Sequence, residues 1–439
     1  MLKPSTLSGF MELLPAPQIA FNKMLDSVRA VFESFGAVPL DTPVMERAEI
    51  LLAKAGGETE KQIYAFEKGD TKLALRFDLT VPLAKYVALH AGQLRFPFKR
   101  YHIGKVYRGE RAQKGRFREF YQCDIDVVGV DTLSLGYDAE IVAVACKAVA
   151  ALGLGDFVVN ISNRKIVSGL LEMAEISDAA RPEVMHALDK MPKVGLDETR
   201  SWLGEIGLNP RQIAMLAETM ARRGAGPAVL DELARLPGQT ALFRTGVEEL
   251  TRVVGLAGSM GVPAANLAVN LGIVRGLDYY TGTVYETFAT AAPEFGSIMS
   301  GGRYDDLAGF YTTQKLPGVG ISLGLTRLFD LMTNAGLVKA DAATSARLTV
   351  IPMDPADPRI CAAAAALSGQ VRQAGIAVDV LWDEGKSFKS RLGSAAKTGV
   401  PFVAIIGADE AGDGTASVKN MATGEQARVP LSAVRGAIA

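Results

Sequence analysis

The sequence has little cysteine and little histidine. Its three cysteines, Cys123, Cys146 and Cys361, lie far apart and show neither the spacing of a metal-binding cluster nor a disulfide framework. The three histidines are equally scattered, which argues against a histidine-rich metal site and against a catalytic triad built on histidine. We therefore expect a protein of a reducing compartment, with no metal held by a cluster of its own side chains.

The sequence also has almost no net charge, since 47 Lys and Arg residues nearly balance 48 Asp and Glu residues to give −1 at neutral pH. Any nucleic-acid partner must therefore be met by a local basic patch. Stretches long enough to span a membrane all contain charges, and the first ten residues have no apolar core typical of a secretory leader. We expect a cytoplasmic protein with no membrane partner and no DNA partner.

The length of 439 residues predicts two to four domains, and the hydrophobic content of 49% allows them sizeable cores. Between residues 165 and 260, Leu, Ala and Met recur at helical spacing with breaks at Pro and Gly, which predicts a helical domain packed on itself. Strand and helix patterns alternate from 347 to 439, which predicts a small α/β domain with a largely parallel sheet. The chemically distinctive motifs lie outside these two regions.

The most unusual stretch is basic, because Lys99 to Arg118 holds eight Lys or Arg residues and one acid, Glu110. Such a concentration of positive charge predicts an anionic partner. The flanks alternate like strands around a turn-like centre, which indicates an antiparallel hairpin with a long basic loop. Arg108 enters this loop and Arg116 leaves it, so two planar, permanently charged guanidinium groups could hold a polyphosphate from two sides. The alternative is a solvated basic hairpin without a ligand, and the residues of the hairpin alone do not distinguish these two interpretations.

The strand after the loop has two faces of different character. Alternate residues form a polar set, Gln122, Asp124 and Asp126, and a more apolar set that includes Cys123 and Ile125. We therefore expect one face to rest on a core and the other to face a polar site. On the polar face, Gln122 and Asp126 are placed to bind a small cationic group. The alternative is that the two acids serve solubility alone.

A second polar pair precedes a predicted helix over Val81–Leu94. Asp78 and Thr80 have the same strand parity, so a carboxylate and a hydroxyl could face one side and hold an ammonium group. The same two residues could instead cap the helix, and capping alone explains them well.

Aromatic and glycine-rich segments follow the helical region. The segment RGLDYYTGTVYE would place Arg275 at a sheet edge, while Tyr279 and Tyr280 offer hydroxyl groups and aromatic walls. Paired tyrosines are also common in cores and interfaces, and these residues alone leave both roles open. The adjacent Gly301 and Gly302 predict a close approach of backbone to a ligand, or a bulge.

A glycine-spaced strand from Gly318 runs into a helix that Arg327 opens. Its glycines would let a flat ring lie against the strand, with the arginine at the level of the ligand. The spacing also resembles part of a dinucleotide-binding fingerprint, but no compact βαβ unit with an acid at the expected distance surrounds it.

Together these motifs resemble those of the histidyl-tRNA synthetases, a family of class II aminoacyl-tRNA synthetases. Pro43 with its flanks is similar to class II motif 1, Tyr107–Gln122 to motif 2, and Gly320–Arg327 to motif 3. Arg275–Tyr280 (RGLDYY) and Ser300–Tyr304 (SGGRY) are similar to the two histidine-specific signatures, and these are the most specific matches. The likeness extends over essentially the whole chain.

The resemblance implies a class II synthetase fold, with an α+β catalytic domain on a mixed, mainly antiparallel sheet. This domain is expected over residues 1–164 and 261–333, with a helical insertion at 165–260, a linker at 334–346 and an anticodon-binding α/β domain at 347–439. The implied reaction uses ATP and Mg2+ to activate L-histidine as histidyl-adenylate and transfers histidine to tRNA(His), releasing AMP and pyrophosphate. The likeness at Pro43 further implies a homodimer.

The resemblance also implies roles for individual residues. Arg108 and Arg275 would be catalytic, and Arg111 and Gln113 would contact the acceptor end of tRNA. The implied ATP-binding residues are Arg108, Glu110, Arg116 and Arg327. The implied histidine-binding residues are Asp78, Thr80, Gln122, Asp126, Arg275, Tyr279, Tyr280, Gly301 and Gly302.

Two positions depart from the family pattern. Thr326 stands where many relatives have an acid, which affects one expected hydrogen bond around the nucleotide, and Asp78 stands where many bacterial relatives have Glu. Two other functions compete with catalysis. The first is a non-catalytic, histidine-sensing paralogue like the regulatory subunit of ATP phosphoribosyltransferase, and the second is a synthetase-like domain that senses uncharged tRNA. Intact RGLDYY, the three arginines at 108, 275 and 327, and the added C-terminal domain favour the enzyme.

Overall fold

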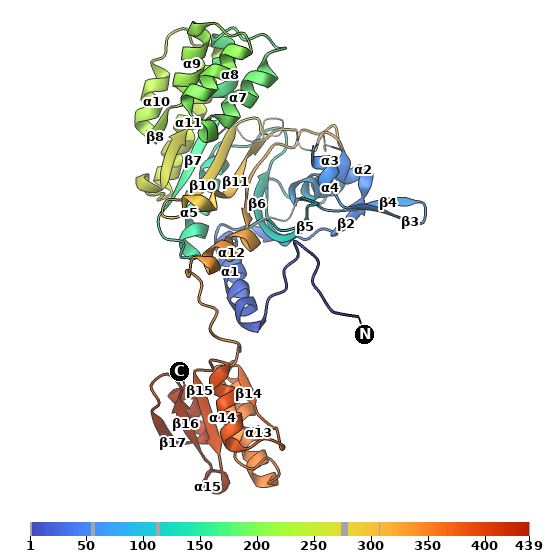
Figure 1. Cartoon of the computed structure of the whole chain (residues 1–439), viewed down its shortest axis with the longest axis vertical. Coiled ribbons are helices and arrows are strands. Elements are labelled where there is room, and N and C mark those ends of the chain that lie inside the picture. The colour runs from blue at the N-terminus through green and yellow to red at the C-terminus, as the bar shows by residue number, and fades with distance from the viewer. Residues whose placement is uncertain (1, 54–57, 111–114, 274–279, 307, 439) are drawn as a thin grey trace. The chain divides into compact units, whose positions relative to one another are not determined.

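The computed structural model describes residues 2–53, 58–110, 115–273, 280–306 and 308–438. The chain forms two compact units, the first of residues 1–11 and 24–337 and the second of residues 12–23 and 338–439, and each unit has its own principal sheet (Figure 1). Among the described residues, no helix has the length and apolar character needed to cross a membrane.

The first unit is built on a nine-stranded sheet. In spatial order its strands are β1 (Val38–Pro39), β5 (Phe98–Tyr107), β6 (Glu119–Val128), β12 (Gly318–Gly324), β11 (Ser297–Tyr304), β10 (Thr283–Ala289), β7 (Phe157–Asn163), β9 (Leu267–Asn270) and β8 (Arg223–Ala225). Neighbouring strands are antiparallel except β1 with β5 and β7 with β9, which are parallel. This is the mixed, mainly antiparallel sheet that the family resemblance implies.

The basic segment forms the predicted hairpin, with β5 and β6 as its strands and Arg100 opposite Asp126. From Gln122 to the end of β6 every residue is buried, so the polar face of this strand is covered rather than solvated. Asp124 is 1% exposed and Asp126 is 4% exposed. The alternative that these acids serve solubility is therefore wrong, because such a role requires contact with water.

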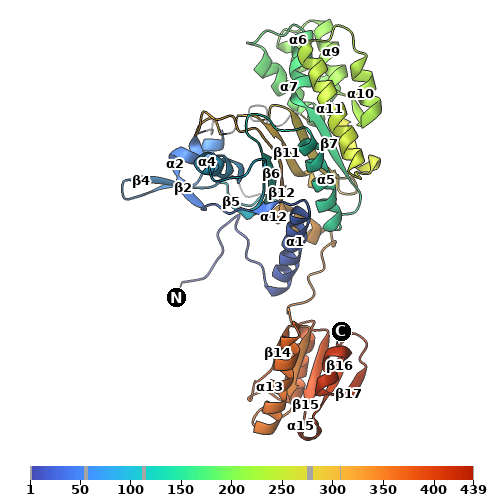
Figure 2. The same ribbon diagram turned by 180° about the vertical axis from the view of Figure 1, so that it is seen from behind.

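Two helices hold the centre of the sheet. Helix α5 (Gly136–Ala151) packs against β7, β10, β11 and β12, and α12 (Leu325–Asn334) packs against β6 (Figure 2). A buried ion pair fixes α5, because Arg303 on β11 donates from Nε to Oδ1 of Asp138 at 3.1 Å and also donates from Nη2 to the same carboxylate. Tyr285 on β10 donates to the main-chain oxygen of Asp138 at 3.0 Å. Arg303 of the SGGRY segment therefore anchors a helix.

The region between β7 and β9 is largely helical, as the sequence predicts. Its helices are α6 (Arg164–Met173), α7 (Arg181–Val194), α8 (Leu196–Glu205), α9 (Pro210–Met220), α10 (Gly226–Ala234) and α11 (Ala241–Ser259), followed by the 3-10 turn η1 (Ala264–Asn266). A Cβ atom at Gly169 would lie 2.4 Å from the main-chain nitrogen of Phe243, so glycine allows α6 and α11 to cross closely. The short strand β8 lies within this region and pairs with β9, a feature that the helical spacing does not reveal.

Further elements lie outside the large sheet. A three-stranded sheet has the order β2-β4-β3, and another 3-10 turn, η2, precedes β11. The bounds of these elements are α1 (Pro15–Ser34), β2 (Met45–Arg47), α2 (Ala48–Leu52), α3 (Glu58–Gln62), β3 (Ala65–Lys68), β4 (Thr71–Leu75), α4 (Thr80–His90) and η2 (Pro293–Phe295). Pro43 lies in the loop before β2, which agrees with its lack of an N–H donor for a strand ladder.

The second unit contains a five-stranded sheet in the order β14-β13-β15-β16-β17. Its elements are β13 (Leu348–Pro352), α13 (Pro358–Gln373), β14 (Val378–Val380), α14 (Phe388–Lys397), β15 (Phe402–Ile406), α15 (Ala408–Asp413), β16 (Thr415–Asn420), β17 (Gln426–Pro430), η3 (Leu431–Ala433) and α16 (Val434–Ala437). β14, β13 and β15 are mutually parallel, whereas β15, β16 and β17 are antiparallel. The sheet is thus less parallel than predicted, because the short turn after Asn420 can join only antiparallel strands.

Candidate active site

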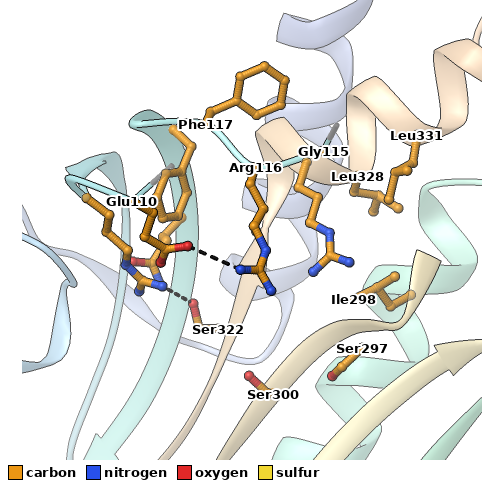
Figure 3. A pocket seen from close by; sticks show the side chains of 15 residues that line it. Glu110, Gly115, Arg116, Phe117, Ser297, Ile298, Ser300, Ser322, Leu328 and Leu331 are labelled. Carbon is orange, nitrogen blue, oxygen red and sulfur yellow. Dashed lines mark hydrogen bonds and ion pairs between the residues drawn. The ribbon is translucent and has the colours of Figure 1, made fainter. Parts of the chain in front are cut away.

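The main cavity of the first unit has a volume of about 320 Å³, within the range of sites for small ligands. It lies against β6, β11, β12, α12 and the two ends of the basic loop. Its lining consists of Arg108, Glu110, Gly115, Arg116, Phe117, Phe120, Gln122, Ser297, Ile298, Ser300, Ser322, Gly324, Arg327, Leu328 and Leu331 (Figure 3). Three arginines, several serine hydroxyls and aromatic and aliphatic walls meet here, which suits a ligand with both a polyphosphate and a flat ring.

Arg108 is held in place before any ligand binds. Its Nε donates to the main-chain oxygen of Phe77 at 3.0 Å, and its guanidinium carbon lies 5.1 Å from the centre of the Phe120 ring. The first contact fixes the direction of the planar group and the second is a cation–π interaction. A cavity wall therefore carries a positive charge of fixed orientation.

The other two arginines come from different elements. Arg116, on the far side of the loop, pairs with Glu110 at 3.5 Å and extends toward the space bordered by Ser300 (Figure 3). Arg327, in the first turn of α12, donates from Nη2 to the main-chain oxygen of Phe295 at 2.8 Å. The fold thus brings together at one cavity the arginines that the sequence places about two hundred positions apart.

A smaller hollow of about 30 Å³ adjoins the main cavity. Its lining is Thr80, Asp124, Asp126, Tyr280, Ser300, Gly301, Gly302, Tyr304, Gly320, Ile321 and Ser322. Ser300 and Ser322 line both spaces. A site rich in carboxylates and hydroxyls therefore opens beside a site rich in guanidinium groups, so that a cationic ligand and an anionic ligand can meet.

Three glycines allow the walls of this hollow to close. A Cβ atom at Gly302 would lie 2.8 Å from the ring of Tyr280, and one at Gly320 would lie 2.1 Å from Oδ1 of Asp126. At Gly301 it would lie 2.1 Å from the main-chain oxygen of Gly320. The close approach that these glycines predict is thus made by the protein's own side chains and backbone.

Asp126 is fixed from two sides. Its Oδ2 lies 2.7 Å from Nη2 of Arg100, which is 0% exposed, and its Oδ1 accepts a hydrogen bond of 2.9 Å from the hydroxyl of Tyr304. Burial raises the pKa of the Asp126 carboxyl, while Arg100 and the Tyr304 hydroxyl oppose that increase. Burial likewise raises the pKa of Tyr280, which keeps its phenol protonated and able to donate.

Sequence reasoning assigned no role to Arg100, Asp124, Ser322 or Tyr304. Asp124 lies between Gln122 and Asp126 on the same face of β6, and Ser322 is its register partner on β12. Parity already placed Asp124 on the polar face, and the hairpin register would have paired Arg100 with Asp126. Ser322 had no local signal, because its neighbour is about two hundred residues away in the sequence.

Asp78 makes the hydrogen bond at the helix start that its sequence context allowed, and it is not among the described residues that line either space. Its Oδ1 accepts a hydrogen bond of 3.0 Å from the main-chain N–H of Val81 at the start of α4, and Thr80, the first residue of that helix, lines the small hollow. Burial raises the pKa of the Asp78 carboxyl, whereas this N–H and Arg108 lower it. α4 ends at His90, four residues before the predicted end.

Thr326 is buried and does not line either space. Its Oγ1 accepts a hydrogen bond of 2.8 Å from the main-chain N–H of Tyr121, which ties α12 to β6. The residue that departs from the family pattern thus acts between the helix that carries Arg327 and the strand that carries Gln122.

Replacing Thr326 by valine should lower the free energy of unfolding of the first unit by about 1–3 kcal/mol, because the side chain keeps its shape but leaves the Tyr121 N–H without its acceptor. Urea denaturation, followed by circular dichroism, measures this change. Thr326→Ser, which keeps the hydroxyl, is the matched control. Equal losses in both variants would show that packing of the methyl group, and not the hydrogen bond, is what matters.

Four predicted site residues lie outside the described part of the chain. Arg275 and Tyr279 fall in residues 274–279, and Arg111 and Gln113 fall in residues 111–114. The described residues that the sequence assigned to ATP all line the main cavity. Of those assigned to histidine, Thr80, Asp126, Tyr280, Gly301 and Gly302 line the small hollow and Gln122 lines the main cavity.

Comparison with known proteins gives consistent matches over the whole chain. The family model for histidyl-tRNA synthetase matches residues 9–328, and that for an anticodon binding domain matches residues 347–439. A histidine–tRNA ligase of Clostridium tetani is 48% identical over 433 residues, covering 98% of this chain and 97% of that protein.

Solved structures agree with the sequence comparison. The histidyl-tRNA synthetase of Nostoc sp. PCC 7120 has a TM-score of 0.92 and 39% identity, covering 100% of this chain and 99% of that one. A protein of Bacillus halodurans, described as an ATP phosphoribosyltransferase regulatory subunit/histidyl-tRNA synthetase, has a TM-score of 0.75 and 24% identity, covering 90% of this chain and 97% of that one. The second likeness is a likeness of fold alone.

Proposed function

The chain belongs to the histidyl-tRNA synthetase family and has the activity of a histidine–tRNA ligase, and from this premise we propose that its two adjoining spaces hold ATP and histidine during the first step of the reaction. The observation that carries the proposal is the shared border formed by Ser300 and Ser322. Across that border, a carboxylate of one ligand can reach a phosphate of the other.

The larger space is the proposed ATP site. Arg108 binds the α-phosphate and the carboxylate of histidine, and Arg116 orients the triphosphate. Arg327 binds on the γ-phosphate side and packs near the adenine, which Glu110 helps to orient. Guanidinium groups suit these tasks because each offers paired donors and a permanent charge to phosphate oxygens.

The smaller space is the proposed histidine site. The ammonium group of histidine is bound at the border between the spaces by Asp78, Thr80 and Gln122, of which Thr80 lines the smaller space and Gln122 the larger one. Its imidazole is bound by Asp126 and Tyr280, since a carboxylate can accept from one ring nitrogen while a phenol donates to the other. Tyr279 and the backbone at Gly301 and Gly302 complete this site in the proposal. A site that pairs both ring nitrogens rejects ligands without them by roughly four to five powers of ten.

The first step is attack by the histidine carboxylate oxygen on the α-phosphorus of ATP, with cleavage of the bond to pyrophosphate. Negative charge on the phosphoryl oxygens is stabilised by groups that are already oriented, so little rearrangement is needed as the reaction proceeds. Arg108 meets this description through its contacts with Phe77 and Phe120. Arg275 is proposed to stand opposite Arg108, as a second fixed cation.

Mg2+ belongs to the proposal as the ion that accompanies ATP. Among the described residues lining the main cavity, Glu110 is the one carboxylate, and a site of this kind usually holds Mg2+ through substrate phosphates and one or two carboxylates. The donor set thus fits an ion that arrives with the nucleotide. When bound, the ion would neutralise part of the phosphate charge.

The second step transfers histidine to the terminal ribose of tRNA(His) and releases AMP. Arg111 and Gln113 are proposed to contact the acceptor end, and residues 347–439 the anticodon. The proposed domain division keeps residues 1–164 and 261–333 as the catalytic domain, 165–260 as the insertion and 334–346 as the linker. A homodimer formed near Pro43 and a cytoplasmic location complete the proposal.

Histidine-dependent exchange of labelled pyrophosphate into ATP, followed by charging of tRNA, tests the whole proposal. We expect exchange that requires histidine, and charging of tRNA(His) but of no other tRNA. A histidine sensor related to the regulatory subunit would bind histidine without exchange. A sensor of uncharged tRNA would bind tRNA without charging it, and either result would refute catalysis.

A further inference from the structure

A chain of three polar side chains runs from the small hollow to the main cavity. Gln122 donates from Nε2 to Oγ of Ser322 at 2.7 Å, and the Ser322 hydroxyl donates in turn to Oδ1 of Asp124. All three belong to the paired strands β6 and β12, on which Ser322 stands opposite Asp124. Strand geometry therefore fixes their spacing.

The direction of these hydrogen bonds follows from the chemistry of a carboxylate. An ionised carboxylate can only accept, so the single hydroxyl hydrogen of Ser322 must point toward Asp124. The Ser322 oxygen is then left as an acceptor, and the amide group of Gln122 must present its NH2 to it. The amide carbonyl oxygen of Gln122 is thereby turned away from Ser322.

The side-chain carbonyl oxygen of Gln122 can still accept a hydrogen bond. Gln122 is 8% exposed, and its Oε1 is buried without a hydrogen bond from any residue that the structure describes. A buried carbonyl without a donor is costly in a folded protein. Gln122 lines the main cavity beside Ser322, which borders both spaces, so a ligand that reaches across this border from the small hollow can supply the missing donor.

We propose that Asp124 and Ser322 are positioning residues that lock the side-chain amide of Gln122 with its carbonyl oxygen facing the substrate's ammonium group. The inference rests on the proposed placement of histidine. Without the lock, the Ser322 hydroxyl can donate to the Gln122 carbonyl instead. The amide then presents its NH2 donor to a cation, which removes an attraction and adds a repulsion.

The surroundings of Asp124 make the lock sensitive to pH. Burial raises the pKa of its carboxyl to about 7, with Asp126 and Asp78 acting in the same direction and Arg100 and the Ser322 hydroxyl opposing them. Tyr280 lies in the same hollow as a protonated phenol. His102, opposite Asp124 on β5, is neutral because burial, Arg100 and Arg76 lower its pKa to about 3.

Protonation of Asp124 reverses the chain of donors. A carboxylic acid can donate to the Ser322 oxygen, which frees the Ser322 hydrogen to donate to the Gln122 carbonyl. The lock is therefore present above the pKa of the free enzyme and is lost as pH falls through it. The KM for histidine should rise at low pH for this reason, in addition to the titration of the substrate's own imidazole.

The experiment compares wild type, Ser322→Ala, Gln122→Ala and the double variant by pyrophosphate exchange. Ser322→Ala should raise the KM for histidine roughly tenfold, the cost of one charge-assisted hydrogen bond whose acceptor is no longer held toward the substrate, while the KM for ATP changes less than about twofold. In the Gln122→Ala background the same substitution should change the KM for histidine less than about twofold, because the effect passes through Gln122. Ser322→Thr, which keeps the hydroxyl, should restore wild-type behaviour.

The pH profile gives a second readout. The advantage of wild type over Ser322→Ala in KM for histidine should be full near about pH 8 and should disappear toward about pH 6, since substrate titration is common to both proteins. An effect of Ser322→Ala that is the same in both Gln122 backgrounds, or independent of pH, would overturn the proposal. If Gln122→Ala itself leaves the KM for histidine unchanged, the placement of histidine has failed instead.

Discussion

Replacing Arg108 by alanine is expected to lower the rate of histidine-dependent pyrophosphate exchange by about a hundred- to a thousandfold. This is the usual effect of removing one preorganised donor from a site where charge develops, about 3–4 kcal/mol. The guanidinium group is already fixed by the Phe77 oxygen and the Phe120 ring, so the native enzyme spends no free energy orienting it during the reaction. Exchange at saturating ATP and histidine measures the loss in kcat.

A neighbouring lysine provides the matched control. Lys105 lies on the same strand-and-loop segment but pairs with Glu119 at 2.7 Å, and its side chain is 41% exposed outside the lining of either space. Lys105→Ala removes the same unit of charge from the hairpin, and exposed ion pairs of this kind contribute little. We expect less than about a twofold change in exchange. Comparable losses in both variants would mean that general basicity, and not the orientation of Arg108, supports the reaction.

Replacing Asp126 by alanine is expected to raise the KM for histidine by about a hundredfold or more and to leave the KM for ATP nearly unchanged. The variant removes the proposed partner of one imidazole nitrogen, and sites built on such hydrogen bonds discriminate strongly. It also leaves Arg100 buried without its counter-charge, which should lower the free energy of unfolding by about 3–5 kcal/mol. KM values come from pyrophosphate exchange, and the stability change comes from urea denaturation.

A second variant separates binding from folding. Removing both charges, by Arg100→Met together with Asp126→Leu, should recover most of the lost stability, because the uncompensated buried arginine is gone. The KM for histidine should stay high in this double variant. Equal increases in the KM for histidine and for ATP in Asp126→Ala, or recovery of histidine binding in the double variant, would contradict the role given to Asp126.

Local patterns in the sequence indicated several of the side chains that line the two spaces. The basic segment with Arg108 and Arg116, the polar face of β6 and the glycine-spaced strand before Arg327 each carry their own signal in charge, parity or glycine spacing. These patterns depend on residues close together in the chain. They therefore indicate which side chains share a face, even though they do not reveal what lies opposite.

Other parts of the site depend on which strands become neighbours. Ser322 faces Asp124 only because β12 pairs with β6, and this register is set by the whole sheet. Strand β8 was hidden for the same reason, since three residues inside a helical region gain strand character from β9. Capping and ligand binding at Asp78 also could not be separated from the sequence, because a carboxylate two residues before a helix can accept from the N–H groups of the first turn or from a ligand.

Because Arg303 anchors α5, the residues of the SGGRY segment differ in what they indicate about the activity of a homologue. Alternate residues of that strand project to opposite sides, so Tyr304 lines the small hollow, the proposed histidine site, whereas Arg303 holds helix α5. A descendant that loses catalysis but keeps its fold still needs the arginine and the buried ring of Tyr304, which packs in a hydrophobic cluster, but it no longer needs the tyrosine hydroxyl. Retention of the arginine in a distant homologue is thus a sign of ancestry, and retention of the hydroxyl on the next residue is the better guide to whether that homologue is still an active enzyme.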